Sequence, residues 1–237
     1  MNIDSNPDLI NLGVMRKMPM AKKSEVKGYF ERVAPEWDKM RESFFDEKLR
    51  DAVIQQADIK SGFTVLDAGT GTGFMAIGAA VAVGKNGKVI GVDLSEAMLA
   101  KARENLEHEG LARRVELRVG DLEKLPVEDG AVDAVICNMG LHHCPSPQKA
   151  IKEMVRVLKP RGRLVISDLE KHGEKWLRTE MADVWLGFDL KNVENMLRKA
   201  GLRGVQVKLA RTKCCGMSIG GRRVTIGIFV AEGCKPS

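Results

Sequence analysis

The sequence lacks the features that mark several classes of protein. It contains no run of about 18 apolar residues, so we expect no helix that spans a membrane. Its first twenty residues show no basic start followed by an apolar block, so we expect no secretory signal. Internal repeats and low-complexity tracts are also missing. What remains is a globular chain of 237 residues, long enough for one large domain or for one domain with small additions.

Cysteine is sparse, and the five cysteines are an odd number. In a chain of this length an odd number is typical of reduced thiols rather than of a disulfide framework. No two of them have the C-x-x-C spacing that commonly holds zinc, and we predict no metal ligands. The cysteine content therefore predicts a cytoplasmic protein.

Aromatic side chains are absent from the basic clusters of the chain. The formal net charge of +6 could indicate an anionic partner. Without interleaved aromatic residues, however, these clusters offer no surface on which bases could stack. Acidic and basic residues also alternate along most of the chain, which favours an ordinary solvated surface over a nucleic-acid partner. The clusters are Arg16-Lys17 with Lys22-Lys23, and residues 208–213 with Arg222-Arg223.

From about residue 62 the chain alternates between strand and helix patterns. Strands separated by single helices are typical of parallel βαβ units, so we predict an α/β fold with an open, doubly wound sheet. The last two strands have no clear helix between them and predict an antiparallel hairpin. The predicted strands are 63–68, the end of 85–93, 114–120, 131–138, 163–168, 205–210 and 223–233; the predicted helices are 73–83, 94–110 with Ser95 as N-cap, 147–162 with Pro160 and Gly162 as stop signals, and 189–202.

The N-terminal part differs from the rest. Residues 1–25 are expected to be loosely structured, and residues 26–60 to be helical. These helices either pack across the top of the sheet as a cap or serve as plain support. We therefore predict an N-terminal segment with a helical cap at 1–60, and a core at 61–237 with a covering insertion at about 168–190.

The segment VLDAGTGTGF (65–74) combines an apolar strand with a glycine-rich turn. In open α/β sheets, ligands bind beyond the carboxyl ends of the strands, where this turn lies. Its glycines let backbone N–H groups face a ligand, and the next helix adds its positive end. Gly69, Gly71 and Gly73 are spaced G-x-G-x-G, whereas the dinucleotide fingerprint is G-x-G-x-x-G, and Asp67 precedes the first glycine.

Two acids follow the next strands. Asp93 ends the second strand and can accept hydrogen bonds from both hydroxyls of a ribose, or it can cap the following helix together with Ser95. Asp121 ends the third strand and could accept from an adenine amino group, or it could simply form a turn.

Four segments in this order resemble class I S-adenosylmethionine-dependent methyltransferases over roughly residues 28–232. They are VLDAGTGTGF, the acid that ends VIGVDLS, VGDLEKLP, and AVDAVICNMGLHHCPSPQKAIKEMVRVLKPRGRLVISD. The resemblance implies a Rossmann-like sheet of seven strands, mostly parallel, with an antiparallel last strand. It also implies S-adenosylmethionine as methyl donor and S-adenosylhomocysteine as product.

The resemblance assigns residues to the donor site. Asp67 and the glycine turn would meet the methionyl part, Asp93 the ribose and Asp121 the adenine. Apolar neighbours would flank the adenine, and the end of the fourth strand would face the sulfonium. The predicted set is Asp67, Gly69, Thr70, Gly71, Gly73, Asp93, Leu94, Met98, Gly120, Asp121, Leu122, Asn138 and Met139.

Two further segments carry narrower resemblances. YFERVAPEWDKM (29–40) resembles the opening helix of the ubiquinone/menaquinone-type subgroup, which adds Tyr29 and Trp37 to the donor site unless they only pack an amphipathic helix. Residues 168–202 are similar to the stretch after strand five in methyltransferase domains fused to metal-sensor-type regulators. We expect this insertion to cover the active site, and the substrate pocket to lie between residues 26–45, 139–147 and 168–190.

Candidate groups for proton removal lie in the same region. The sulfonium already activates its methyl group, so the enzyme mainly aligns the reactants and excludes water, and a base is needed only if the acceptor carries a proton. His142 and His143 follow the fourth strand, and His172 lies on the insertion. We rank His142 slightly ahead of His143 as base; each could instead be a loop residue or a hydrogen-bond partner.

The expected activity is methyl transfer to a small molecule. The vicinal Cys214-Cys215 pair allows arsenite or thiol methylation as an alternative, although Asn138-Met139 stands where arsenite methyltransferases carry a cysteine. RNA methylation is another alternative, suggested by the excess of basic residues. The fourth-strand loop reads NMGLHH rather than Asn/Asp-Pro-Pro-aromatic, which argues against base-amino methylation but not against every RNA substrate. A nicotinamide oxidoreductase and a non-catalytic S-adenosylmethionine sensor are disfavoured. The acceptor and the oligomeric state are not readable from the sequence.

Overall fold

The computed structural model of the chain describes residues 22–237. The basic pair Arg16-Lys17 and most of the segment expected to be loosely structured lie outside these residues. The end of that segment is helical, because Lys23–Val33 forms α1. Among residues 22–237, none of the helices combines the length and the apolar character that a membrane crossing requires.

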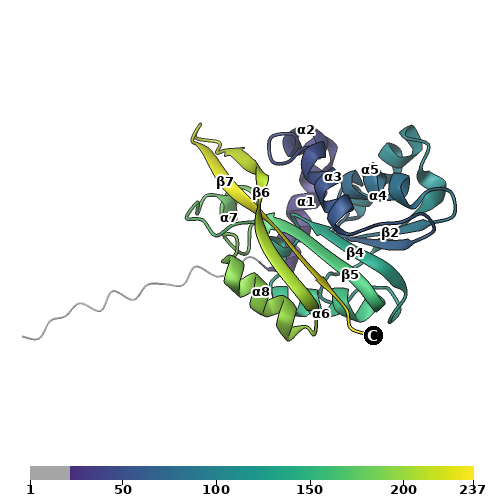
Figure 1. Ribbon diagram of the computed structural model, residues 1–237. Coiled ribbons are helices and arrows are strands. Elements are labelled where there is room, and N and C mark those ends of the chain that lie inside the picture. Colours follow the sequence, from purple (N-terminus) through teal and green to yellow (C-terminus); the bar gives the residue numbers. More distant parts are fainter. Residues whose placement is uncertain (1–21) are drawn as a thin grey trace, which may run out of the picture.

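Seven strands form one sheet in the order β3-β2-β1-β4-β5-β7-β6 (Figure 1). The strands from β3 to β5 are parallel to one another, and β7 is antiparallel to both β5 and β6. This confirms the predicted Rossmann-like fold and its reversed C-terminal hairpin. The strands are β1 (Thr64–Ala68), β2 (Lys88–Asp93), β3 (Val115–Val119), β4 (Val132–Asn138), β5 (Leu158–Leu169), β6 (Arg203–Met217) and β7 (Arg223–Cys234).

Helices cover both faces of the sheet (Figure 1). On one face lie α3 (Glu47–Gln56), α4 (Phe74–Val83) and α5 (Glu96–His108); on the other lie α6 (Pro147–Val157) and α8 (Leu190–Lys199). Successive strand residues point to opposite faces, so Val65 packs with the first layer and Leu66 with the second. Because both faces are covered, the central strands read as continuous apolar runs.

Short helical pieces complete the chain. The segment expected to be helical at 26–60 is divided into α1, η1 (Ala34–Glu36), α2 (Trp37–Arg41) and α3, and the remaining pieces are η2 (Ala112–Arg114), η3 (Leu141–His143) and α7 (Leu177–Glu180). Local capping explains where several helices begin. Ser95 Oγ accepts from the amide of Met98 at 3.1 Å, which confirms it as the N-cap of α5.

The helix predicted at 147–162 is too long. It ends at Val157, and β5 already begins at Leu158. Proline disfavours helical backbone at the residue before it and cannot donate a helical hydrogen bond, so Pro160 ends the helix earlier than expected. The pairing of β5 with β4 jumps from Leu158 to Arg163, so residues 159–162 bulge out of the ladder.

The C-terminal hairpin is longer than predicted. Instead of 205–210, β6 runs from Arg203 to Met217, and its register against β7 shifts twice. The outer part of the hairpin projects past the rest of the sheet (Figure 1). This part pairs Cys214 with Ile226 and lies above the carboxyl ends of the parallel strands, so it belongs to the walls of the site.

Candidate active site

The glycine turn follows the carboxyl end of β1. Gly69, Gly71 and Gly73 have φ values of +80°, +52° and +89°, a conformation that glycine adopts far more readily than other residues. The amides of Gly69 and Thr70 donate to the carbonyl of Val92 at 2.8 and 3.0 Å, which ties the turn to β2. A Cβ atom on Gly71 would meet only Trp37 Nε1, at 3.8 Å. The turn therefore presents bare backbone to an open space.

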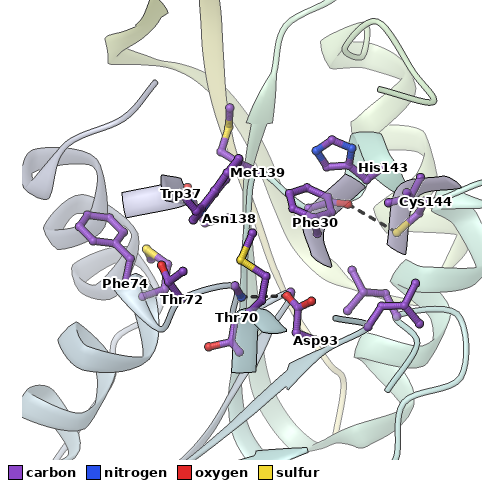
Figure 2. Close-up of a pocket in the computed structure, with 18 of the residues that line it drawn as sticks. Phe30, Trp37, Thr70, Thr72, Phe74, Asp93, Asn138, Met139, His143 and Cys144 are labelled. Atoms are coloured by element: carbon purple, nitrogen blue, oxygen red, sulfur yellow. Dashed lines mark hydrogen bonds between the residues drawn. The ribbon is translucent and has the colours of Figure 1, made fainter. Parts of the chain in front are cut away.

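That space is the first pocket, a cavity of about 910 Å³. Aromatic side chains from the N-terminal helices and from α4 form part of its wall, and Asp93 lies at its floor near the turn (Figure 2). Residues of α1 and α2 contribute to this wall, and the role of the N-terminal helices as a cap stays a prediction. Of the predicted donor-site set, Gly69, Thr70, Gly71, Asp93, Leu94, Met98, Gly120, Asp121, Leu122, Asn138, Met139 and Trp37 line the first pocket.

Asp93 combines the two roles that the sequence left open. Its Oδ1 accepts from the amide of Ser95 at 2.9 Å, and its Oδ2 accepts from the amide of Gly71 at 2.8 Å. Burial raises its pKa, while the backbone donors around it favour the carboxylate. Each carboxylate oxygen can accept more than one hydrogen bond, so a side chain that holds the turn can also bind hydroxyl groups in the pocket.

Asp67 and Gly73 lie behind the turn rather than on the pocket wall. Asp67 is fully buried, and its Oδ2 accepts from Thr70 Oγ1 at 2.7 Å, whereas its Oδ1 has no partner among the described residues. Burial raises the pKa of Asp67 to about 7. A Cβ on Gly73 would lie 3.4 Å from Ala102, so this glycine permits close packing of the turn on α5.

A second pocket of about 470 Å³ adjoins the first and shares four wall residues with it, namely Trp37, Phe45, Met139 and His143. Its other walls are mostly apolar, and they come from the predicted segments 26–45, 139–147 and 168–190. The outer hairpin adds a wall that the sequence did not predict. Besides the four shared residues, the second pocket is lined by Phe44, His142, Leu169, Leu177, Met181 and Asp183, and by Cys214, Gly216, Val224 and Ile226 of the hairpin.

His142 lies between two buried carboxylates. Its Nδ1–H donates to Asp168 Oδ1 at 2.7 Å, and its Nε2 lies 3.7 Å from Asp183 Oδ1. Asp168 is itself fixed, because its Oδ2 accepts from the amides of Leu141 and His142. Burial favours the neutral ring, but the two carboxylates outweigh it and raise the pKa of His142 to about 9. Burial also raises the pKa of Asp183 to about 7, against the opposing charge of His142.

His143 has a different environment. Its ring contacts Phe30 edge-on, with centroids 4.9 Å apart, and its Nδ1 lies 3.3 Å from the carbonyl of Ala182. Burial and the neighbouring charge of His142 lower the pKa of His143 well below its usual range. A protonated ring has no lone pair to take a proton, and a ring with a strongly lowered pKa is a weak base. The order of His142 and His143 as candidate bases therefore stays a prediction.

Three other predicted residues lie away from both pockets. The hydroxyl of Tyr29 donates to the sulfur of Met181 at 3.2 Å, and burial raises its pKa to about 12. His172 Nδ1 accepts from the amide of Glu174. Cys215 is exposed, whereas Cys214 is buried on the wall of the second pocket, because neighbouring strand residues point to opposite faces. The vicinal thiols therefore do not face one metalloid together.

The sequence missed residues that act through distant contacts. Asp168 lies at the end of β5 as Asp93 lies at the end of β2, so an acid at the end of a strand was the available signal. No sequence pattern marked Lys23 as a site residue. Its Nζ lies 2.5 Å from Asp121 Oδ2 and 3.3 Å from Glu123 Oε2, which ties α1 to the far end of the first pocket. Phe30 and Asp183 also become site residues only through packing.

Together, the doubly wound sheet with a reversed last strand, the glycine cradle and Asp93 define a nucleoside-binding α/β protein. Residues 59–209 match the family model described as a methyltransferase domain. The chain is 31% identical over 220 residues to the demethylmenaquinone methyltransferase of Bacillus cereus (strain ATCC 10987 / NRS 248), covering 81% of this chain and 92% of that protein. It is 36% identical over 153 residues to that of Desulfitobacterium hafniense (strain Y51), covering 63% of this chain and 60% of that protein.

Solved structures agree with this. A SAM-dependent methyltransferase from Aquifex aeolicus superposes with a TM-score of 0.60 at 26% identity, covering 89% of this chain and 97% of that one. The [4+2]-cyclase SpnF shares the fold, with a TM-score of 0.71 at 19% identity and coverage of 92% and 98%. The chain belongs to the methyltransferase domain family and is an S-adenosylmethionine-dependent methyltransferase.

The first pocket fits S-adenosylmethionine. The bare backbone at Gly71 admits the close approach of a ligand, and Asp93 offers acceptor positions beside it. Asp67 has an unpartnered oxygen behind the turn, and a cationic ligand nearby would favour the charged form of this carboxyl group. When bound, S-adenosylmethionine supplies a methyl group that its positively charged sulfur has already activated. The residues of the chain have to bind, orient and exclude water.

Proposed function

We propose that this enzyme transfers the methyl group from S-adenosylmethionine in the first pocket to a small molecule in the second pocket. The main support for this proposal is that the two pockets share the wall residues Trp37, Phe45, Met139 and His143. A donor in one pocket and an acceptor in the other would meet at these residues. Alignment of two reactants across a short gap is the main source of rate acceleration that such a site can provide.

The chemistry of the second pocket indicates its ligand. Aromatic and aliphatic side chains dominate, and the charged groups are confined to the cluster around His142 and Asp183. Such a surface suits an apolar ring that carries one ionisable hydroxyl or thiol group. The two relatives named as demethylmenaquinone methyltransferases support a ring of the quinol type. We propose a quinol or phenol as the acceptor class.

The residues on the shared wall would hold the two reactants together. Met139 has a φ of +54°, a strained conformation for a residue with a side chain, which directs this side chain between the pockets. Trp37 and Phe30 line the first pocket (Figure 2) and would help to exclude water from a bound donor. The ring of His143 faces both cavities, so the ionisable group of the acceptor would lie against it.

The test uses the purified full chain after removal of copurified ligand. Calorimetric titration with S-adenosylhomocysteine and with NADH should give micromolar binding of the former alone. A screen with labelled S-adenosylmethionine should then transfer label to reduced quinones or phenols. Transfer to arsenite or to RNA but to no quinol or phenol would overturn the proposed acceptor. Failure to bind S-adenosylhomocysteine would contradict the assignment of the first pocket.

A further inference from the structure

Three side chains on the wall of the second pocket bring metal-ligand atoms together. One ligand atom from each of His142, His143 and Asp183 lies within 4.8 Å of the others. The histidines come from η3 after β4, whereas Asp183 comes from the loop after α7. Zinc bonds to nitrogen and oxygen are about 2.0–2.2 Å long, so tetrahedral ligand atoms lie about 3.4 Å apart. His142 Nε2 and Asp183 Oδ1, at 3.7 Å, are already close to that separation.

Both rings are held by their other nitrogen atom. His142 Nδ1 bonds to Asp168 Oδ1 at 2.7 Å, and His143 Nδ1 faces the carbonyl of Ala182 at 3.3 Å. In metal sites, the ring nitrogen that does not bind the metal usually donates to a carboxylate or to a backbone carbonyl. These contacts leave the Nε2 atoms of both rings as the available ligands. The outer shell of a metal site is therefore present around both histidines.

The third ligand has an unsatisfied atom. Asp183 is 2% exposed, and its Oδ2 has no hydrogen-bond partner among the described residues. An orphaned buried carboxylate oxygen is costly, and such groups normally pair or bind a cation. Asp168, also fully buried, lies on the other side of the His142 ring. A divalent cation bound here would place positive charge beside these two buried carboxyl groups.

We propose that His142, His143 and Asp183 bind one first-row divalent cation, with zinc as the preferred type, on the wall of the second pocket. Two imidazoles and one carboxylate with an open position form a catalytic rather than a closed structural set. All three residues line the second pocket, so the open position faces the acceptor. As far as its catalytic role is concerned, this inference rests on the proposed function.

The cation would change how the acceptor is activated. A hydroxyl or thiol bound at the open position becomes more acidic, and its proton leaves to solvent. The acceptor heteroatom then forms a bond to the methyl carbon, while the carbon–sulfur bond of the donor breaks and its electron pair stays on sulfur. With the cation bound, the lone pairs of both histidines are engaged, so neither ring acts as the base.

The test measures metal binding without turnover. Chelator-treated full-length protein is titrated with Zn²⁺ by calorimetry and with Co²⁺ by visible absorption, before and after saturation with S-adenosylhomocysteine. We expect one ion per chain, micromolar or tighter, and a four- or five-coordinate Co²⁺ spectrum. Asp183→Asn, which keeps the shape of the side chain, should weaken Zn²⁺ binding at least tenfold. His143→Asn should do the same.

Two matched control variants test whether the added Zn²⁺ binds to exposed side chains instead of the proposed site. His108 and Cys215 are exposed and lie outside both pockets, so His108→Asn and Cys215→Ser should keep full Zn²⁺ affinity. Asp183 does not line the first pocket, so Asp183→Asn should still bind S-adenosylhomocysteine, which also shows that it is folded. Binding of S-adenosylhomocysteine without any stoichiometric Zn²⁺ site would overturn the metal site and leave the proposed function intact. Zn²⁺ affinity that depends on His108 or Cys215, and not on Asp183, would overturn it as well.

Discussion

The ammonium group of Lys23 lies 2.5 Å from the carboxylate of Asp121, and both residues line the first pocket. Lys23 is the first residue of α1, so this ion pair fastens the N-terminal cap to the end of β3. The resemblance to methyltransferases assigns Asp121 to the adenine of the donor. The cap and the bound nucleoside would therefore share one carboxylate.

Lys23→Met should release the donor product faster. Both partners of the pair are partly exposed, so its loss should change the free energy of unfolding by no more than about 1 kcal/mol. Dissociation of S-adenosylhomocysteine, followed by stopped-flow tryptophan fluorescence, should accelerate several-fold because the cap is no longer fastened. The matched control is Lys27→Met on the same helix, whose partner Glu96 lies outside the pocket. Equal dissociation rates for the two variants would refute this role of Lys23.

Asp93→Ala should abolish tight binding of the donor. The substitution removes acceptors for the amides of Gly71 and Ser95 and for the expected ribose hydroxyls. We expect S-adenosylhomocysteine affinity to fall at least a hundredfold by calorimetry. The free energy of unfolding should fall by only about 1–3 kcal/mol, because two backbone donors near the pocket lose their partner. An affinity equal to that of the wild type would mean that Asp93 only supports the turn.

Gly71→Ala should block the donor from the first pocket, and comparison with a control glycine should separate this steric effect from backbone strain. A side chain at a φ of +52° costs about 1–2 kcal/mol, and its Cβ would enter the space in front of Trp37. We expect S-adenosylhomocysteine binding to become unmeasurable while the protein stays folded. Gly221→Ala is the control, since Gly221 has a φ of +79°, with nothing within 4 Å of the added Cβ, and does not line the first pocket. A Gly71→Ala variant that binds as well as Gly221→Ala would show that the turn is not the cradle.

Asp67 should make stability depend on pH. Burial raises its pKa from 3.8 to about 7, so the folded protein holds a proton that the unfolded chain has already lost. Its contribution is fully present below pH 3.8 and is lost as pH rises through about 7. Asp67→Asn keeps an acceptor for Thr70 Oγ1 without a charge. The unfolding free energy of the wild type should fall relative to this variant by roughly 3 kcal/mol between pH 4 and 7.5. Parallel curves from urea unfolding would contradict the raised pKa.

Local patterns explain which parts of the molecule the sequence predicted. Consecutive strands and the turn after β1 depend on residues close in the chain, so the parallel order, the glycine cradle and the place of Asp93 could be predicted. Asp93 and Gly71 illustrate this, since the end of β2 and the turn after β1 already place them at the edge of the sheet where a ligand is expected. The N-cap role of Ser95 follows from local backbone chemistry in the same way.

Long-range convergence explains what the sequence could not give. Asp168 and Asp183 flank His142 only because β5, η3 and the loop after α7 meet at one edge of the sheet. The pKa of a histidine depends on such neighbours, so no spacing rule could rank His142 against His143. The separation of Cys214 from Cys215 likewise required β6 to extend past its predicted end, which places one thiol inside and the other outside.

The position of β6 at the edge of the sheet suggests a physical role for the basic residues of this strand. Among residues 22–237, β7 is the one strand that pairs with β6, so β6 forms an edge of the sheet. On this edge the amide of Cys215 donates to the carbonyl of Ser43 at 3.1 Å. Along this edge Lys208, Arg211 and Lys213 are exposed. Two copies of the chain that approached edge to edge would bring rows of like charge together, and this repulsion opposes sheet extension between molecules. Part of the excess positive charge thus lies on an edge strand, where like charges oppose edge-to-edge association of two copies.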